Sequence, residues 1–182
     1  FFGQGLPQQL RAAASQERGA TTFAYRVTAP ERYGVVEFSD DGSPVAFEEK
    51  PTKPKSPWAV TGLYFYDSAV IDIARQLKPS SRGELEIVDI HQAYLKSGNM
   101  SVERLGRGIA WLDTGTHNSL LQAGQFVQTI EQRQNQKIAC LEEIALRMNY
   151  IDADAFRELA WKHGQTTYGT YLQRIVEEVS SN

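Results

Sequence analysis

The chain has 182 residues, of which 41% are hydrophobic and 23% are charged, and this composition predicts one globular domain with room for a small appendage. Its net charge of −3 argues against nucleic acid as the main partner, and its single cysteine, Cys140, excludes an internal disulfide framework and is typical of a reducing cytoplasm. No apolar run approaches the roughly 18 residues that a membrane-spanning helix needs.

The first third of the chain carries one helix signal and then strand signals. A helix is predicted at 6–18, because Pro7 suits a first helical turn and Gly19 ends the pattern. Segments rich in β-branched and aromatic residues predict strands at 21–28, 33–38, 45–49 and 58–66. Asp40–Ser43 predicts a hairpin turn, and the proline-rich stretch 51–57 predicts a surface loop. The strand at 58–66 is nearly all apolar, which is typical of a strand covered on both faces.

Helix signals dominate the rest of the chain. Short helices are predicted at 68–77 and 84–96, and strand segments at 100–105 and 109–112. Thr116 suits the N-cap of a long helix from His117 to about Arg133. The residues expected on the core face of that helix are Leu120, Ala123, Val127 and Ile130. Three small helices follow, at 142–147, 153–161 with Asp152 as cap, and 168–179.

Strands joined partly by a hairpin and mixed with helices indicate an α/β fold with a mixed sheet and helices packed on it. We expect this part to cover residues 1–136, and a helical region to cover 137–182. Zinc chemistry is not indicated, since neither a His-Glu-x-x-His nor a Cys-x-x-Cys pattern occurs. The scattered His91, His117 and His163 are expected to be surface or cap residues and receive no role.

Three loop segments carry residue types that suit a ligand site. Glu49 and Lys50 end a strand, where a carboxylate can accept hydrogen bonds from sugar hydroxyls and an ammonium can neutralise a phosphate. Gly34, after Tyr33, allows a ligand to approach the backbone closely. The Arg82 guanidinium could clamp a phosphate. Taken alone, Glu49 and Lys50 are usually explained as a solvated charge cluster at a strand end. A tight strand start explains Gly34 equally well, and a loop arginine such as Arg82 is ordinarily solvated.

The run Trp111–Thr116 has two interpretations. Asp113, Thr114 and Gly115 are common turn residues, and with Thr116 they lead the chain into a helix. Alternatively, the Asp113 carboxylate holds a divalent cation beside a phosphate. Taken with the loop segments above, the second interpretation points to phosphoryl or nucleotidyl transfer to a sugar phosphate.

Six motifs occur together and in order. They are Glu31–Val36, Glu48–Pro51, Ala59–Tyr64, Arg82–Ile87, Trp111–Thr116 and Lys137–Ala145. In this arrangement the chain resembles, over nearly its whole length, the short bacterial form of the glucose-1-phosphate thymidylyltransferase family. The resemblance implies a three-layer α/β/α fold of the nucleotide-diphospho-sugar transferase type and a Mg²⁺-dependent reaction of dTTP with glucose 1-phosphate, which gives dTDP-glucose and pyrophosphate.

The resemblance also implies roles for individual residues. Lys50, Arg82 and Asp113 would be catalytic, with Asp113 as a metal ligand. The implied substrate-binding residues are Tyr33, Gly34, Glu49, Lys50, Val60, Gly62, Tyr64, Arg82 and Trp111. A regulatory site for a dTDP-sugar effector would use Arg107, Lys137 and Arg147, and the family suggests a cytoplasmic homotetramer that feeds polysaccharide synthesis.

The chain departs from the family pattern at its start. The family's Gly-Gly-x-Gly-Thr-Arg-Leu loop, which cradles the nucleotide, is absent, and a Gly-Asp-Asn run with a second metal aspartate is expected before Phe1. We therefore expect an N-terminally truncated form that lacks the first βαβ units and is inactive by itself. Two alternatives stay open: a related pyrophosphorylase that uses UTP, and a non-catalytic module that binds sugar phosphates or nucleotides.

Overall fold

The computed structural model describes residues 1–180, and the chain divides into two compact units, Phe1–Trp111 and Leu112–Asn182. Each unit is described by itself. The sequence predicts a boundary at 136, but the division falls earlier, because the long helix α4 (His117–Gln134) groups with the helices that follow it. The regulatory or oligomerisation role of 137–182 stays a prediction.

The first unit is built on a five-stranded sheet with the order β4-β3-β5-β2-β6. The strands are β2 (Ala20–Arg26), β3 (Gly34–Phe38), β4 (Pro44–Glu49), β5 (Trp58–Tyr66) and β6 (Met100–Arg104). Neighbouring strands are antiparallel except β2 and β6, which are parallel. The sheet is therefore mixed, and β3 and β4 form the predicted hairpin.

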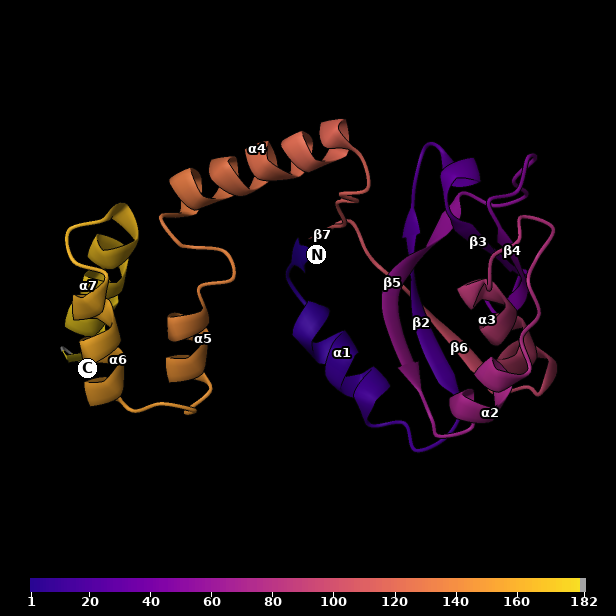
Figure 1. Cartoon of the computed structure of the whole chain (residues 1–182), viewed down its shortest axis with the longest axis horizontal. Helices are drawn as coiled ribbons and strands as arrows, with labels where there is room; N and C mark the ends of the chain where they lie inside the picture. Colours follow the sequence, from indigo (N-terminus) through magenta and orange to yellow (C-terminus); the bar gives the residue numbers. More distant parts are fainter. Residues whose placement is uncertain (181–182) are drawn as a thin grey trace. The chain divides into compact units, whose positions relative to one another are not determined.

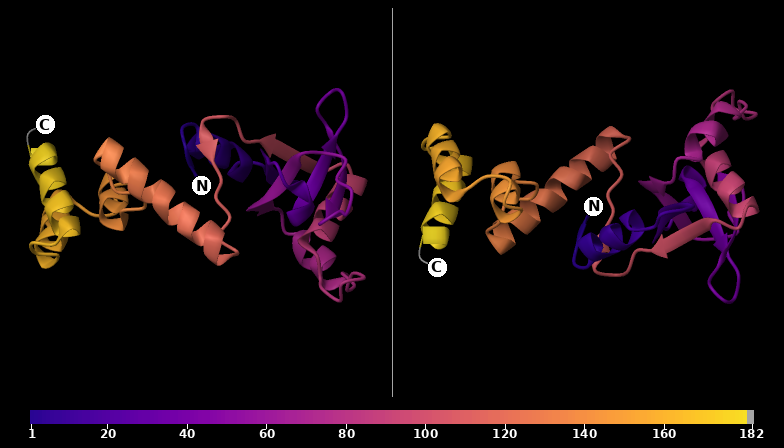
Figure 2. Two further views of the ribbon diagram at one scale, coloured as in Figure 1. Left: turned by 90° about the horizontal axis from the view of Figure 1, so that it is seen from above. Right: turned by 90° about the horizontal axis from the view of Figure 1, so that it is seen from below.

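Helices cover both faces of this sheet (Figures 1 and 2). The helices α2 (Val70–Arg75) and α3 (Ile87–Lys96) lie on one face and α1 (Leu6–Ala14) lies on the other. The core beneath α2 and α3 consists of Ala20, Ala24, Val36, Phe47, Val60, Val88, Ile90, Tyr94 and Met100. The core beneath α1 consists of Ala13, Phe23, Leu105 and Ile109. This arrangement confirms the predicted three-layer α/β/α fold.

The segment after β6 does not return to the main sheet as predicted. Instead β7 (Ile109–Ala110) pairs with β1 (Phe2–Gly3) in a separate two-stranded ribbon. A Cβ at Gly3 would lie 2.4 Å from the Gly108 carbonyl oxygen, so only glycine permits this close approach. The pairing joins segments about a hundred residues apart, which local sequence signals cannot reveal.

Two expectations about burial in this unit are wrong. His91 is fully buried instead of lying at the surface, and its Nε2 shares a 2.8 Å hydrogen bond with the Tyr66 hydroxyl. Burial lowers the pKa of His91 to about 4, so the ring is neutral at physiological pH. Strand β5 is buried only over 59–61, and its later residues are partly or fully exposed.

The second unit is helical. After α4 it contains α5 (Leu141–Arg147), α6 (Ala153–Lys162) and α7 (Thr167–Ser180). Its core consists of Cys140, Phe156, Ala160, Tyr171, Leu172 and Ile175. Both predicted N-caps are confirmed: the Thr116 hydroxyl accepts from the Ser119 amide at 3.1 Å, and the Asp152 carboxylate accepts from the Ala155 amide at 2.8 Å.

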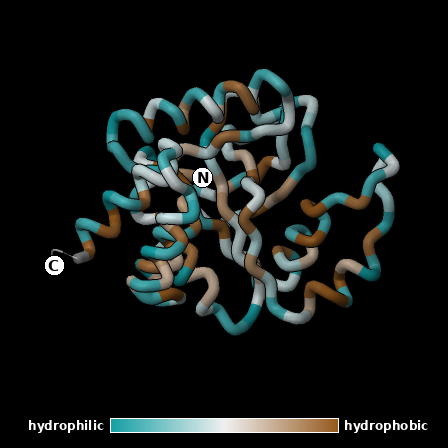
Figure 3. Tube along the Cα trace, turned by 60° about the vertical axis from the view of Figure 1, so that its left-hand side comes forward, coloured by the Kyte–Doolittle hydropathy of each residue, from teal (hydrophilic) through white to brown (hydrophobic). Residues whose placement is uncertain are grey.

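Helix α4 does not bury the face expected of it. None of its residues is buried, and Leu120 is 57% exposed. The hydropathy trace in Figure 3 shows hydrophobic and hydrophilic positions alternating along the helices. Within residues 1–180, no helix is long and apolar enough to cross a membrane.

Candidate functional site

A pocket of about 170 Å³ lies in the first unit, where β3, β4, β5 and the start of α3 meet. Its lining residues are Arg32, Tyr33, Gly34, Glu49, Lys50, Val60, Tyr64, Ile87 and Val88. The strand register explains this grouping, because Gly34 is the cross-strand partner of Glu49 and the Lys50 amide donates to the Tyr33 carbonyl at 3.0 Å. Six of the predicted substrate-binding residues therefore share one pocket.

Gly34 keeps this pocket open. A Cβ at this position would lie 2.9 Å from Val88 Cγ2 and 3.0 Å from Glu49 Oε2. Any larger residue would therefore push against the carboxylate and the base of α3. The approach of a ligand to the Gly34 backbone stays a prediction.

Glu49 is the central carboxylate of the pocket, and its side chain is 19% exposed. Burial, together with the nearby Glu86 carboxylate, raises the pKa of Glu49, while Lys50 and Arg82 oppose the shift. The Lys50 Nζ lies 3.8 Å and the Arg82 Nη1 lies 3.7 Å from Glu49 Oε1. Both cations are near the Glu49 carboxylate but beyond direct hydrogen-bond distance from it, so neither is hydrogen-bonded to Glu49.

Arg82 is held beside the pocket by three carboxylates. Besides Glu49, it contacts Glu84 at 2.9 Å and Glu86 at 3.5 Å. The Ser80 hydroxyl donates to Glu86 at 2.8 Å and fixes that carboxylate. The guanidinium is therefore oriented before any ligand arrives, although Arg82 does not line the pocket itself.

The backbone of Lys50 is strained. Its φ of 43° lies in the left-handed region, which a residue with a Cβ adopts at a cost of about 1–2 kcal/mol. The hydrogen bond from its amide to Tyr33 stabilises this conformation. Strain of this kind is common at ligand sites.

Tyr64 and Trp111 form apolar parts of the site. Burial and the Glu49 charge raise the pKa of Tyr64, so its phenol stays neutral at physiological pH. The Trp111 ring lies 5.1 Å from the Tyr33 ring and 5.9 Å from the Tyr25 ring, centroid to centroid. Trp111 therefore supports a pocket wall from behind.

The structure does not place every predicted residue in this pocket. Gly62 is not among its lining residues, and a Cβ there would meet nothing within 4 Å. Asp113 belongs to the second unit, where its Oδ1 accepts from the Gly115 amide at 3.1 Å. The turn interpretation of Trp111–Thr116 is thus confirmed, and the metal-binding role of Asp113 stays a prediction.

The side chains of the chain can be compared with the ligands that Mg²⁺ prefers. Among residues 1–180, no group of three or more His, Cys, Asp or Glu side chains could hold a metal ion. Mg²⁺, however, is commonly bound through one or two carboxylates, with water and substrate phosphates completing its shell. The single Asp113 carboxylate is compatible with that mode of binding.

The predicted regulatory residues do not form one cluster within either unit. Arg107 belongs to the first unit, whereas Lys137 and Arg147 belong to the second. Lys137 Nζ lies 2.5 Å from Glu131, and Arg147 Nη2 lies 2.6 Å from Glu143. Their role in binding an effector stays a prediction.

Four residues at the site were not predicted from the sequence: Arg32, Glu86, Ile87 and Val88. The Arg32 guanidinium lies 5.6 Å from the centre of the Tyr33 ring, and Ile87 and Val88 begin α3 and wall the pocket. Arg32 lies inside the motif Glu31–Val36, and Glu86 and Ile87 lie inside the motif Arg82–Ile87. The positions of these three residues could therefore have been predicted if every residue of each motif had been assigned to the site.

Comparison with known proteins places this chain in a family. The family model described as Nucleotidyl transferase matches residues 1–130. The glucose-1-phosphate thymidylyltransferase of Neisseria meningitidis serogroup A is 54% identical over 178 residues, which are 98% of this chain and 62% of that protein. That of Xanthomonas campestris pv. campestris (strain B100) is 50% identical over 97% of this chain and 60% of that protein.

A solved Bacillus anthracis structure, assigned as a glucose-1-phosphate thymidylyltransferase in complex with sucrose, is 40% identical with a TM-score of 0.61. The match covers 69% of this chain and 50% of that one. The chain spans about three fifths of the length of the curated relatives it matches. From the family match and the pocket geometry together, the chain belongs to the nucleotidyl transferase family.

Proposed function

We propose that this chain is the sugar-phosphate-binding and C-terminal part of a cytoplasmic glucose-1-phosphate thymidylyltransferase. The whole protein would convert dTTP and glucose 1-phosphate into dTDP-glucose and pyrophosphate, a step in nucleotide-sugar and polysaccharide synthesis. The observation that carries this proposal is the pocket around Gly34 and Glu49, in which a largely buried carboxylate lies beside the Lys50 ammonium, with the Arg82 guanidinium held next to the pocket. The relatives named above support the choice of substrates.

In this proposal Glu49 accepts hydrogen bonds from glucose hydroxyls, and Gly34 lets the sugar ring approach the backbone of β3. Lys50 and Arg82 hold the sugar phosphate, whose oxygen attacks the α-phosphorus of dTTP in line with the departing pyrophosphate. Tyr64, Val60 and the start of α3 exclude water from the sugar. These residues position the nucleophile and compensate its charge, which is the main work of such a transfer.

The proposal includes Mg²⁺, with Asp113 as one of its ligands. The ion would neutralise charge on the triphosphate. It also includes a homotetramer with a dTDP-sugar effector at Arg107, Lys137 and Arg147. The resemblance supports these two points.

The test is turnover of the full-length protein encoded by the gene, with glucose 1-phosphate, Mg²⁺ and either dTTP or UTP. We expect dTDP-glucose and pyrophosphate, measured by ion-exchange chromatography, and a clear preference for dTTP. A strong preference for UTP would replace the proposal with a related pyrophosphorylase. Binding of glucose 1-phosphate without turnover of either nucleotide would favour a non-catalytic binding module.

A further inference from the structure

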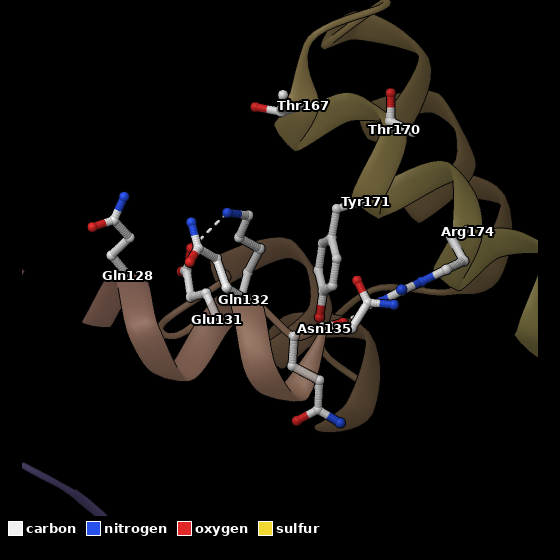
Figure 4. Close-up of a pocket in the computed structure, with 10 residues that line it drawn as sticks. Gln128, Glu131, Gln132, Asn135, Thr167, Thr170, Tyr171 and Arg174 are labelled. Atoms are coloured by element: carbon white, nitrogen blue, oxygen red, sulfur yellow. Dashed lines mark hydrogen bonds and ion pairs between the residues drawn. The ribbon is translucent and has the colours of Figure 1, made fainter. Parts of the chain in front are cut away.

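Three buried side-chain atoms within residues 1–180 have no hydrogen-bond partner: Gln9 Oε1, His91 Nδ1 and Arg174 Nε. Arg174 lines a cavity of about 370 Å³ between α4 and α7, together with Glu131 and Lys137 (Figure 4). This cavity belongs to the region of the predicted effector site, because Lys137 is one of its residues. His91 differs from the other two, because the whole residue is buried and it belongs to no site described so far.

His91 lies on α3 and packs against the side chains of strand β5. Its ring is 5.3 Å from the Tyr64 ring and 6.0 Å from the Tyr66 ring, centroid to centroid. Tyr64 and Tyr66 are two residues apart on β5, so their side chains point to the same face of the sheet. Tyr64 lines the pocket around Glu49, whereas His91 does not. His91 therefore contacts a pocket residue without being part of the pocket surface.

One hydrogen bond fixes the His91 ring. Its Nε2 shares that bond with the Tyr66 hydroxyl at 2.8 Å, and the Phe47 ring packs 5.2 Å away. Tyr94, also on α3, stacks on the Tyr66 ring, but its hydroxyl donates to Asp67, which lies outside the pocket. The orientation of His91 thus depends directly on the Tyr66 hydroxyl.

An imidazole at this position has a cost in stability. Burial lowers the pKa of His91 to about 4, so the ring is neutral at physiological pH. Its Nδ1 nevertheless has no partner among the described residues, and a buried polar atom without a hydrogen bond destabilises a fold. An apolar ring would fill the space without that cost. What the imidazole adds is the hydrogen bond to Tyr66, which holds the ring in one orientation.

Tyr64 needs such support, because it has no hydrogen bond of its own. In the part of the chain that the structure describes, no protein group is hydrogen-bonded to its hydroxyl, and the residue is 36% exposed. Its ring stacks on Tyr66 at 6.0 Å and packs against His91. The position of Tyr64 in the pocket therefore depends on these ring contacts.

We propose that His91 is a positioning residue of the pocket around Glu49: held by the Tyr66 hydroxyl, its ring keeps Tyr64 in the orientation that the sugar of glucose 1-phosphate meets. This inference rests on the proposed function and adds to it a residue that does not touch the substrate. The effect falls on sugar binding, because the transfer step depends on the groups around the phosphates.

The test is steady-state kinetics of the full-length protein with glucose 1-phosphate, dTTP and Mg²⁺. His91→Leu removes both the ring and the hydrogen bond. We expect it to raise the KM for glucose 1-phosphate by about 2–10-fold, the size of one lost aromatic contact, and to leave kcat and the KM for dTTP unchanged. Tyr66→Phe removes only the hydrogen bond and should raise the same KM by a smaller factor.

A double variant separates positioning from stability. In His91→Phe/Tyr66→Phe no polar group of the pair is left unpartnered, so we expect the free energy of unfolding in urea to be at least that of either single variant. The KM for glucose 1-phosphate should nevertheless stay raised, because the bond that orients the ring is absent.

The matched control is Tyr94→Phe, which removes a hydroxyl on the same helix that is bonded to Asp67 instead of His91. It should lower the free energy of unfolding and leave the KM for glucose 1-phosphate unchanged. If Tyr94→Phe raised this KM as much as Tyr66→Phe, the effect would be one of general stability and the inference would be wrong.

Other outcomes also separate this inference from the proposed function. An unchanged KM for glucose 1-phosphate in both His91→Leu and Tyr66→Phe, or a loss of kcat alone, would overturn the inference while turnover by the unchanged protein upholds the proposed function. If His91→Leu does not fold, Tyr66→Phe and the double variant decide. Should the unchanged protein bind glucose 1-phosphate without turnover, the proposed function fails, and the Kd from calorimetry takes the place of the KM with the same order of variants expected. Absence of both turnover and binding would overturn both.

Discussion

The pocket of the sheet unit and the cavity of the helical unit each place a glutamate next to a lysine, but in opposite electrostatic states. Lys50 Nζ lies 3.8 Å from Glu49, whereas Lys137 Nζ lies 2.5 Å from Glu131. Burial raises the pKa of Glu49, whereas the hydrogen bond from Lys137 lowers that of Glu131. In the first pair the lysine and the glutamate are not hydrogen-bonded to each other and can bind a ligand. In the second pair they are hydrogen-bonded to each other.

The same residue types can thus serve binding or structure, and separation decides between the two. A lysine within hydrogen-bond distance of a carboxylate contributes to stability, and its charge is largely cancelled. A lysine just beyond that distance keeps its N–H donors free for a ligand. The predictions below, all on the full-length protein, test this difference between the two units.

The largest expected effect concerns Asp113, a residue of the helical unit. Asp113→Asn should lower kcat by about 10²–10³-fold, because an amide is a poor metal ligand, while the fold is kept because the amide oxygen can still accept from Gly115. Asp154→Asn, an exposed position on α6, is the control. Steady-state kinetics measure the change in kcat, and circular dichroism checks that the fold is kept. Undiminished activity would confine catalysis to the sheet unit.

Gly34→Ala should close the pocket of the sheet unit. The new methyl group would meet Val88 and Glu49 at about 3 Å, and overpacking of about 1–3 kcal/mol would raise the KM for glucose 1-phosphate by up to about 100-fold. Gly62→Ala on β5 meets nothing within 4 Å and should change little. Equal effects in the two variants would return Gly62 to the substrate site and shift the pocket boundary.

The two lysines allow the comparison to be tested directly. Lys50→Met should raise the KM for glucose 1-phosphate by about 10–100-fold, because a charge-assisted hydrogen bond to phosphate is lost. Lys137→Met should leave that KM unchanged and lower the free energy of unfolding by about 1 kcal/mol, because Glu131 loses its partner. Steady-state kinetics measure the KM of each variant, and urea unfolding measures its free energy of unfolding. Exchanged outcomes would refute the assignment of one pair to binding and the other to structure.

The smallest expected effect is the pH dependence of Glu49. Because its folded-state pKa is raised above 4.5, the folded protein binds more protons than the unfolded chain in the window just above that value. Stability from this group is therefore complete at lower pH and declines as the pH rises through the window. Glu49→Gln should remove this decline in thermal melts and raise the KM about 3–10-fold. A KM unchanged by Glu49→Gln would exclude Glu49 from sugar binding.

Local patterns predicted most elements of this chain, because turns and caps depend on near neighbours. The hairpin at Asp40–Ser43, the strand at 58–66 and the caps Thr116 and Asp152 are present as predicted. The errors arise from contacts between distant segments. The ribbon between β1 and β7 and the burial of His91 are examples, since neither leaves a periodic signal.

Some features of the candidate site could likewise be predicted from local sequence, and others could not. The sequence by itself determined which residue types stand at the strand ends, and the motifs at 31–36 and 48–51 contain most of the pocket. Only the tertiary structure decided that Gly34 faces Glu49 across the hairpin, that the start of α3 closes the pocket, and that Lys137 is hydrogen-bonded to its glutamate while Lys50 is not. The physical reason is that these properties depend on separations of a few ångströms between segments far apart in the chain.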